Sequence, residues 1–445
     1  MRCTDGRSDG RTVGQSRRMW ASLGVVVGFL TLCPPDRLAG QTIAITGATI
    51  YPVSGPKIER GTVLVRDGRI VAVGADVAIP GDARRIDGGG KVVTPGFFHA
   101  QSALGLGVGR SLAEENDEEY TAIGGTTDGG QSGEINASFN VLAGVDPNGI
   151  AFPVARMGGI TTAVVMPSGG LIAGQAIVLR LAGHSSGEML VRSPVGMVVD
   201  LSDGSRSAGG GSRAGALARL RSVRQDAAEL RRRPADWSQN RIQPLGAPAR
   251  ELEALYPVLD GSLPVYVQAR RQSDIENAVQ LAQEFRLRLI IRGGTEAWRV
   301  AGVLASARVP VVLDSRDNIP SFDGLQARSD NAALLREAGV TVILAGQDPG
   351  GQMNLRFEAG HAVRNGMQWE DALAAVTIAP AEAFGLGQEM GSLAPGKAAD
   401  LVLWSGDPFE FSTGAELVLI RGQEVPLTSR MTELRERYRT LPPRY

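Results

Sequence analysis

The sequence predicts an α/β protein in which a (β/α)8 TIM barrel is joined to a small β-sandwich domain built from both ends of the chain. The chain has 445 residues, which is more than one compact core usually needs. Its two ends contain short strands and tight turns, whereas residues 96–387 alternate apolar runs with amphipathic helices. Repeated βα units over so long a stretch favour a closed barrel over an open sheet.

The β-rich ends resemble one another in pattern. Residues 41–95 contain the stretches TIAITGATIYPV, TVLVRDGRIVAVG and KVVTPG. Asp67 and Gly68 stand between two alternating runs and predict a hairpin, since glycine accepts the positive φ of a type I′ turn. The pattern returns in ADLVLWSGD and ELVLIRGQEV. We therefore expect residues 41–95 and 388–425 to form one β-sandwich, followed by a C-terminal tail at residues 426–445.

The middle of the chain supplies the barrel. Its apolar runs include ITTAVVMPS, SPVGMVVDL, LPVYVQA, LRLIIRGG, VPVVLDS and VTVILAG, as expected for parallel strands buried on both faces. A helix is predicted over residues 274–285, with Ser273 as its N-cap. GGLIAGQA is glycine-rich, but it is expected to lead from a loop into a further strand rather than to open a helix as a phosphate loop does.

One segment interrupts the alternation of predicted strands and helices. Residues 202–245 begin with a glycine-rich loop and continue as a charged helix that carries Arg231, Arg232 and Arg233. We interpret this segment as a solvated insertion. The alternative is a mobile lid over the barrel mouth, or a contact with an anionic ligand.

The N-terminus is predicted to be a signal peptide at residues 1–40. Arg17 and Arg18 precede an apolar run that is too short for a typical bilayer-spanning helix. This pattern predicts export to the bacterial periplasm or the extracellular space, with cleavage near Gly40 and no membrane span afterwards. Alternatives are an uncleaved anchor, a twin-arginine signal or, with less support, a lipoprotein modified at Cys33.

The composition of the chain limits the classes of binding partner and of catalytic group that we expect. The chain is 43% hydrophobic and 21% charged with a formal net charge of −1, which gives no reason to expect nucleic acid. Both cysteines, Cys3 and Cys33, precede the predicted mature chain, which therefore has no thiol nucleophile or thiolate ligand.

The chain resembles the amidohydrolase superfamily, in its imidazolonepropionase-like, metal-dependent hydrolase branch. GATIYPV…GTVLVRDGRIVAVG and GSLAPGKAADLVLWSGDP resemble the sandwich signatures, and GGITTAVVMPSGGLIAGQAIVLRLAG resembles a barrel unit. The resemblance implies a zinc-activated water that attacks a C–N bond, with four histidines, a bridging lysine or glutamate and a strand-eight aspartate at the barrel rim.

Most of this implied site is absent from the sequence. Gln101 and Ala103 stand where the resemblance places an H-x-H pair, and His99 stands two positions earlier. Gln268 and Gly293 occupy the strand-five and strand-six histidine positions, and Val198 lies near the bridging position. Only Asp348 matches, as the strand-eight aspartate and candidate catalytic residue.

The chain has only three histidines, His99, His184 and His361, so a four-histidine site cannot form. His184 and His361 are interpreted as surface or partly satisfied side chains. We expect no metal cofactor and predict that Arg270 or Arg292 pairs with Asp348 in its place. The alternative is a divalent cation held by oxygen atoms of Asp200, Asp314 and Asp348.

Three functions remain open. The first is a pseudoenzyme that binds a small amide or peptide-like ligand, or a partner chain, in a homo-oligomer or with an active relative. The second is an active hydrolase of C–N bonds that uses Asp348, His99 and the arginines with an atypical or absent metal. The third is a structural role in the cell envelope. Fold alone does not decide among them.

Overall fold

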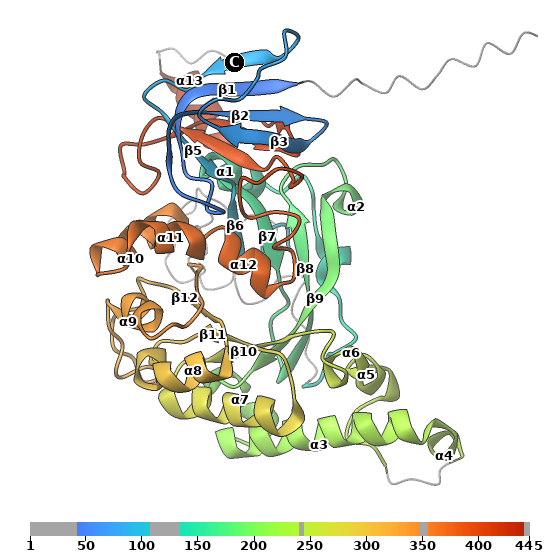
Figure 1. Ribbon diagram of the computed structural model, residues 1–445. Helices are drawn as coiled ribbons and strands as arrows, with labels where there is room; N and C mark the ends of the chain where they lie inside the picture. Colours follow the sequence, from blue (N-terminus) through green and yellow to red (C-terminus); the bar gives the residue numbers. More distant parts are fainter. Residues whose placement is uncertain (1–41, 107–133, 240–243, 347–354, 440–445) are drawn as a thin grey trace, which may run out of the picture. The chain divides into compact units, whose positions relative to one another are not determined.

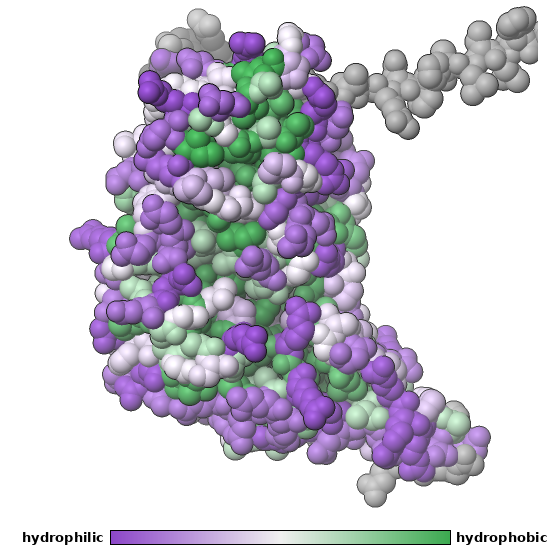
Figure 2. Space-filling model, in the orientation of Figure 1, coloured by the Kyte–Doolittle hydropathy of each residue, from purple (hydrophilic) through white to green (hydrophobic). Residues whose placement is uncertain are grey.

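The computed structural model describes residues 42–106, 134–239, 244–346 and 355–439 (Figure 1). The predicted signal peptide and Asp348 lie outside these ranges. No helix in the described ranges is long and apolar enough to cross a membrane. On the face drawn in Figure 2, hydrophilic residues are interspersed with hydrophobic ones, and hydrophobic residues gather over the β-rich domain.

A β-rich domain built from both ends of the chain is confirmed. Its strands are β1 (Ile43–Ile50), β2 (Ile58–Arg66), β3 (Arg69–Gly74), β4 (Arg84–Asp87), β5 (Val92–Pro95), β14 (Leu401–Trp404), β15 (Ala415–Ile420) and β16 (Gln423–Glu424). Backbone hydrogen bonds link all of them into one sheet in the order β16-β15-β14-β5-β1-β2-β3, with β4 on β1. The C-terminal strand β14 pairs with β5, so the two ends close a single domain.

The predicted hairpin is present between β2 and β3. Asp67 has φ 51° and Gly68 has φ 75°, as a type I′ turn requires at its two central positions. A Cβ at Gly68 would lie 2.8 Å from the backbone oxygen of Arg421. This position therefore needs glycine both for its backbone conformation and for close packing.

The second sheet is a nearly closed barrel of eight strands (Figure 1). They are β6 (Phe97–Ser102), β7 (Ile160–Val165), β8 (Ile172–Arg180), β9 (Leu190–Asp200), β10 (Val265–Ala269), β11 (Leu289–Gly293), β12 (Val311–Leu313) and β13 (Val342–Leu344). They pair in chain order, and β13 contacts β6. The predicted TIM-like barrel is confirmed.

One barrel strand departs from the all-parallel pattern. β8 is antiparallel to both β7 and β9, whereas the other pairs within the barrel are parallel. The connection from β7 to β8 is a turn with Gly169 and Gly170 at positive φ, instead of a helix. The predicted loop and further strand in GGLIAGQA are therefore correct, and this strand is antiparallel, unlike the parallel strands expected for the barrel.

Helices cover the barrel and flank the β-rich domain. They are α1 (Ala151–Met157), α2 (Ser186–Met189), α3 (Arg213–Arg232), α4 (Pro234–Ser238), α5 (Ala249–Glu253), α6 (Tyr256–Leu259), α7 (Gln272–Phe285), α8 (Ala301–Ala307), α9 (Asn331–Glu337), α10 (Leu355–Arg364), α11 (Trp369–Ala375), α12 (Ile378–Ala383) and α13 (Arg430–Tyr438). The last of these shows that the predicted C-terminal tail contains a helix, which begins at a capping box of Ser429 and Thr432.

Helix α7 is the helix predicted at residues 274–285, and it buries Ile275, Ala278, Val279 and Ala282. The predicted N-cap, Ser273, is wrong. The helix begins two residues before Asp274, and its N-cap is Arg271, whose side chain makes no capping bond. Instead, the carboxylate of Glu296 accepts a hydrogen bond from the Gln272 backbone N–H, at 2.9 Å. The orphan donor of this helix end is thus satisfied by a distant side chain.

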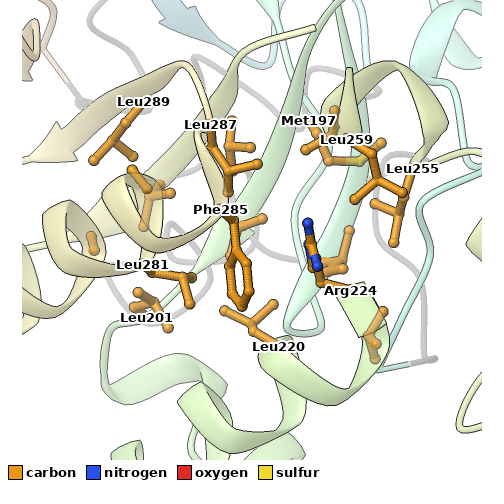
Figure 3. A pocket seen from close by; sticks show the side chains of 18 residues that line it. Met197, Leu201, Leu220, Arg224, Leu255, Leu259, Leu281, Phe285, Leu287 and Leu289 are labelled. Atoms are coloured by element: carbon orange, nitrogen blue, oxygen red, sulfur yellow. The ribbon is translucent and has the colours of Figure 1, made fainter. Parts of the chain in front are cut away.

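The segment at residues 202–245 is not a solvated insertion along its whole length. Helix α3 buries Leu220, Val223, Ala227 and Leu230, whereas Arg231, Arg232 and Arg233 at its end are exposed. Its apolar face and helix α7 enclose a cavity of about 60 Å³ against the barrel, into which Arg224 projects beside Phe285 (Figure 3). The apolar face makes α3 a covering helix of the barrel.

The barrel and the β-rich domain pack through aromatic side chains. Phe97 stacks on Trp404 with ring centroids 5.3 Å apart, and the Trp404 indole N–H donates to the Thr94 hydroxyl at 2.9 Å. Gly159 has φ +81°, and a Cβ there would lie 2.3 Å from the Trp404 ring. This interface fixes the start of β6, the strand that carries His99 and Gln101.

Candidate functional site

The candidate site is the row of side chains at the C-terminal ends of the barrel strands. In the parallel ladders, Gln268 pairs with Asp200 of β9 on one side and with Arg292 of β11 on the other. Paired residues on neighbouring strands face the same side of a sheet. One layer earlier on the same face, Val198, Tyr266 and Ile290 belong to the apolar cluster inside the barrel. Asp200, Gln268 and Arg292 therefore form the layer above this core.

Arg292 is the cation of this layer. Its Nη1 lies 3.5 Å from the sulfur of Met166, the residue that follows β7. Among the described residues, its Nε has no hydrogen-bond partner and no carboxylate forms an ion pair with it. Burial lowers its pKa, and the nearby Tyr266 and Asp200 oppose that effect. The guanidinium is thus held in a protein environment that stabilises it poorly.

Two glutamines lie at the same barrel end. Gln101 on β6 is 7% exposed and Gln268 on β10 is 8% exposed. Within the described part of the chain, the side-chain oxygen of each lacks a hydrogen-bond partner. At Gly293, a Cβ would lie 2.8 Å from Nε2 of Gln268, so the glycine leaves the space that the Gln268 amide occupies. Buried amide oxygens without donors are unusual, because each loses its hydration on folding.

His99 is buried and neutral. Its Nδ1 accepts a hydrogen bond from the Gln101 backbone N–H at 3.2 Å, which leaves Nε2 as the protonated ring nitrogen. Burial lowers the pKa of His99 to about 4, with the charge of Asp314 acting in the opposite direction. Ala103 follows in the turn after β6, where its carbonyl accepts from the Leu106 N–H at 3.0 Å.

A buried carboxylate that the sequence analysis missed lies beside β12. Glu358 on α10 is fully buried and accepts hydrogen bonds from the Ser315 N–H at 3.0 Å, from the Ser315 hydroxyl at 2.9 Å and from the Arg316 guanidinium. Burial, reinforced by Asp314, raises the pKa of Glu358 to about 7. The sequence indicates this burial through helical spacing: Glu358 lies on the same helix face as Leu355 and Ala362, so its carboxylate falls on an apolar face.

Asp200 and Asp314 each stabilise the loop that follows their strand. Oδ1 of Asp200 accepts from the Ser202 N–H at 2.7 Å, and Oδ1 of Asp314 accepts from the Arg316 N–H at 2.9 Å. Such contacts are typical of an aspartate that opens a loop. His184 is exposed and His361 is half-buried against Asn365, as expected for histidines outside a site.

Arginine–carboxylate pairs fasten the loops around this barrel end. Arg270 forms an ion pair with Asp317, and the Thr295 hydroxyl donates to the same carboxylate at 3.0 Å. The Arg270 partner in the described chain is thus Asp317, whereas the predicted pairing with Asp348 lies outside the described residues.

A second pair network joins α3 to the same barrel end. Arg213 contacts Asp203 at 2.8 Å, Asp323 at 2.5 Å and also Asp274. Burial raises the pKa of Asp274 to about 6, although Arg213 opposes the rise. This network was not predicted, because two of its carboxylates, Asp274 and Asp323, lie 61 and 110 positions from Arg213 in the sequence.

Known proteins share this architecture. The amidohydrolase family model matches residues 295–426. The solved structure of an amidohydrolase from Thermotoga maritima MSB8 aligns with 87% of this chain and 100% of its own, at a TM-score of 0.76 and 29% identity. The chain is a member of the amidohydrolase superfamily. A prolidase complexed with N-methylphosphonate-L-proline has the same fold at a TM-score of 0.54, with 17% identity.

Two curated amidohydrolase relatives extend the comparison. The imidazolonepropionase of Acidiphilium cryptum is 26% identical over 84% of this chain and 94% of its own length. The amidohydrolase tasK of Hapsidospora irregularis is also 26% identical, but the match spans 82% of this chain and only 39% of that protein. The resemblance to the imidazolonepropionase-like branch therefore extends over most of the chain.

The zinc that the superfamily implies does not fit the donors present at these strand ends. Glutamine amides are poor zinc ligands, the side chains of Ala103 and Gly293 offer no donor, and Arg292 repels a cation. No group of three or more His, Cys, Asp or Glu in the described ranges could hold a metal ion. An oxygen-ligated cation would need Asp348 in addition to Asp200 and Asp314, whose Oδ1 atoms are engaged in loop caps.

Proposed function

We propose that this amidohydrolase-superfamily member is a non-catalytic binding or partner subunit. The observation that carries the proposal is the row at the ends of β6, β10 and β11. There Gln101, Gln268 and Arg292 occupy the barrel end at which the superfamily assembles its metal-activated water. Without histidine ligands, this row cannot lower the pKa of a bound water in the way a zinc site does.

Elemental analysis and a turnover screen test this proposal on the purified, exported protein. We expect no stoichiometric zinc, manganese or iron, no large thermal stabilisation by added zinc, and no hydrolysis of dipeptides or cyclic amides with or without a chelator. Stoichiometric zinc, or turnover that a chelator abolishes, would contradict the proposal directly. The Acidiphilium cryptum relative assayed in parallel is the positive control for the screen.

The alternative function is an active hydrolase of C–N bonds that works through Asp348. It is supported by the neutral His99 at the end of the barrel that carries Asp314, since a neutral histidine can exchange protons with a substrate. This function predicts metal-independent turnover that Asp348→Asn abolishes and His99→Gln reduces. Turnover unchanged in both variants would remove this alternative.

We also propose that the protein is exported and that its first 40 residues are removed. The charged and apolar pattern of residues 17–33 supports this proposal. Mass spectrometry of the mature protein from the periplasm or medium should find an N-terminus near Gly40. Recovery of the intact chain in the membrane fraction would favour the uncleaved anchor.

A further inference from the structure

Among the described residues, the guanidinium of Arg292 is the charged group most in need of a hydrogen-bond acceptor or counter-ion. Its Nη1 contacts the sulfur of Met166, a weak acceptor, and its Nε is buried without a partner in the described chain. A buried charge without a counter-ion costs several kcal/mol relative to water, so proteins seldom retain one unless a ligand completes it. Arg292 stands in register with Gln268 at the barrel end, so a ligand that enters there meets both side chains.

Two buried glutamines at this barrel end, Gln268 in register with Arg292 and Gln101 at the end of β6, lack hydrogen-bond donors to their side-chain oxygens in the described chain. Beneath them, the hydroxyl of Tyr266 is satisfied, since it donates to the Ala100 carbonyl at 3.2 Å. Within the described residues, the Nε of Arg292 and these two amide oxygens thus lack partners above an apolar floor that includes Phe98 and Ile290, whereas Arg270, whose Nε also lacks one, forms an ion pair with Asp317.

We propose that this site binds a small anionic molecule that carries a carboxylate and at least one N–H, the chemistry of an N-acyl amino acid. Arg292 binds the carboxylate, for which its planar fork is suited. Gln268, which lies in register with Arg292, accepts a hydrogen bond from the ligand N–H. A sulfate satisfies the arginine but offers no donor to Gln268, so the amide acceptor selects against such an anion.

This inference rests on the proposed function, because it uses as ligand-binding groups the residues that replace metal ligands. It adds the ligand class. It also gives Arg292 a role different from the predicted ion pair with Asp348.

Isothermal titration calorimetry with N-acetylglycine tests the site. The matched probes are N-acetylglycinamide, which keeps the acetamido N–H and lacks the charge, and inorganic sulfate, which keeps a negative charge and has no hydrogen-bond donor. We expect N-acetylglycine to bind with a dissociation constant of about 1 mM or lower. Both other probes should bind at least tenfold more weakly.

Variants locate the binding. Arg292→Met should weaken N-acetylglycine binding at least tenfold, Arg292→Lys should weaken it less, and Gln268→Met should lie between them. Arg156→Met is the matched control. Arg156 also has a buried Nε without a partner in the described chain and a pKa lowered by burial. It contacts the Leu181 carbonyl beside the start of β7, at the opposite barrel end, so its replacement should leave binding unchanged.

Each outcome bears on a different claim. Saturable binding that Arg292→Met abolishes, with intact N-acetylglycine recovered by NMR, supports both the site and the non-catalytic function. Cleavage to acetate and glycine keeps the site but overturns the proposed function. Absence of saturable binding by the wild type, or equal binding by wild type and Arg292→Met, overturns the inference and leaves the proposed function in place.

Discussion

Arg213 and Arg292 both belong to the C-terminal end of the barrel, yet they differ in what surrounds them. Arg213 lies at the start of α3 and contacts three carboxylates, Asp203, Asp274 and Asp323. Arg292 lies at the end of β11 and, within the described chain, has a methionine sulfur as its hydrogen-bond acceptor. The described residues provide carboxylate partners for the first arginine and none for the second.

The difference separates a structural role from a binding role. The carboxylates around Arg213 come from the loop after β9, from α7 and from the loop after β12, so the arginine fastens α3 to the loops of the barrel end. Arg292 fastens nothing of this kind in the described chain. A charged group that lowers the stability of the folded state and holds no parts of the structure together is a candidate for function.

Replacing Arg213 with methionine should give the largest effect. It leaves the buried carboxylate of Asp274 without its cation, and breaking such a pair is strongly destabilising. Because the Arg213 side chain is 20% exposed, we expect a loss near the lower end of the usual range, about 3 kcal/mol of unfolding free energy. Urea denaturation measures it. The double variant Arg213→Met, Asp274→Asn should recover part of the loss, and no recovery would show that Asp274 is not the main partner.

Glu358 is the anionic counterpart of this comparison, and its effect depends on pH. The pKa of Glu358 rises from its usual 4.5 to about 7, chiefly because of burial and also because of Asp314, while Arg316 opposes the rise. The folded state then binds the proton more tightly than the unfolded state, so the free energy of unfolding falls as pH rises from about 4.5 to 7.

Glu358→Gln should remove that pH dependence. The variant changes the hydrogen bonds to Ser315 and Arg316 by a roughly constant amount, but its stability relative to the wild type should improve by about 2 kcal/mol between pH 5 and pH 8. Denaturation at several pH values measures this difference. A wild-type and variant pair with parallel pH profiles would show that Glu358 does not titrate in this range.

Replacing Arg292 with methionine should have the opposite sign to the Arg213 variant. Because Arg292 has no carboxylate partner in the described chain, an apolar side chain of similar length should be neutral or stabilising, by about 1 kcal/mol. Thermal denaturation in the absence of ligand measures it. A loss as large as that of Arg213→Met would show that Arg292 has a protein counter-ion, and the comparison between the two arginines would then fail.

Much of the fold was predictable because local chemistry determines it. Gly68 marks a turn that needs positive φ, and the spacing of Ile275, Ala278 and Val279 marks a buried helix face. The reversal of β8 was not predictable from its composition, because apolar runs buried on both faces look alike in either strand direction. The direction follows from the short connection after β7, in which Gly169 and Gly170 form a turn.

The sequence predicted which residues lie at the candidate site, but it did not predict which ion pairs they form. Strand ends in the sequence located Gln268, Arg292 and Asp314 at the barrel end, because chemistry collects there in such barrels. Which arginine has a partner depends on loops far away in the chain: Arg270 pairs with a residue 47 positions later, and Arg213 with one 110 positions later. No local sequence pattern predicts such long-range contacts.

The exposed arginines at the end of α3 give the smallest expected effect and set the lower end of the comparison. Arg232 pairs with Glu229 one turn earlier, but its side chain is 71% exposed. Solvent screens such a pair, and ordering the two long side chains offsets most of the attraction. Arg232→Gln should therefore change the free energy of unfolding by less than about 0.5 kcal/mol and should leave N-acetylglycine binding unchanged. A larger loss would mean that the number of charges on this helix, rather than burial and ion pairing, determines how much its arginines contribute to the free energy of unfolding. The contrast between Arg213 and Arg292 would then need a different explanation.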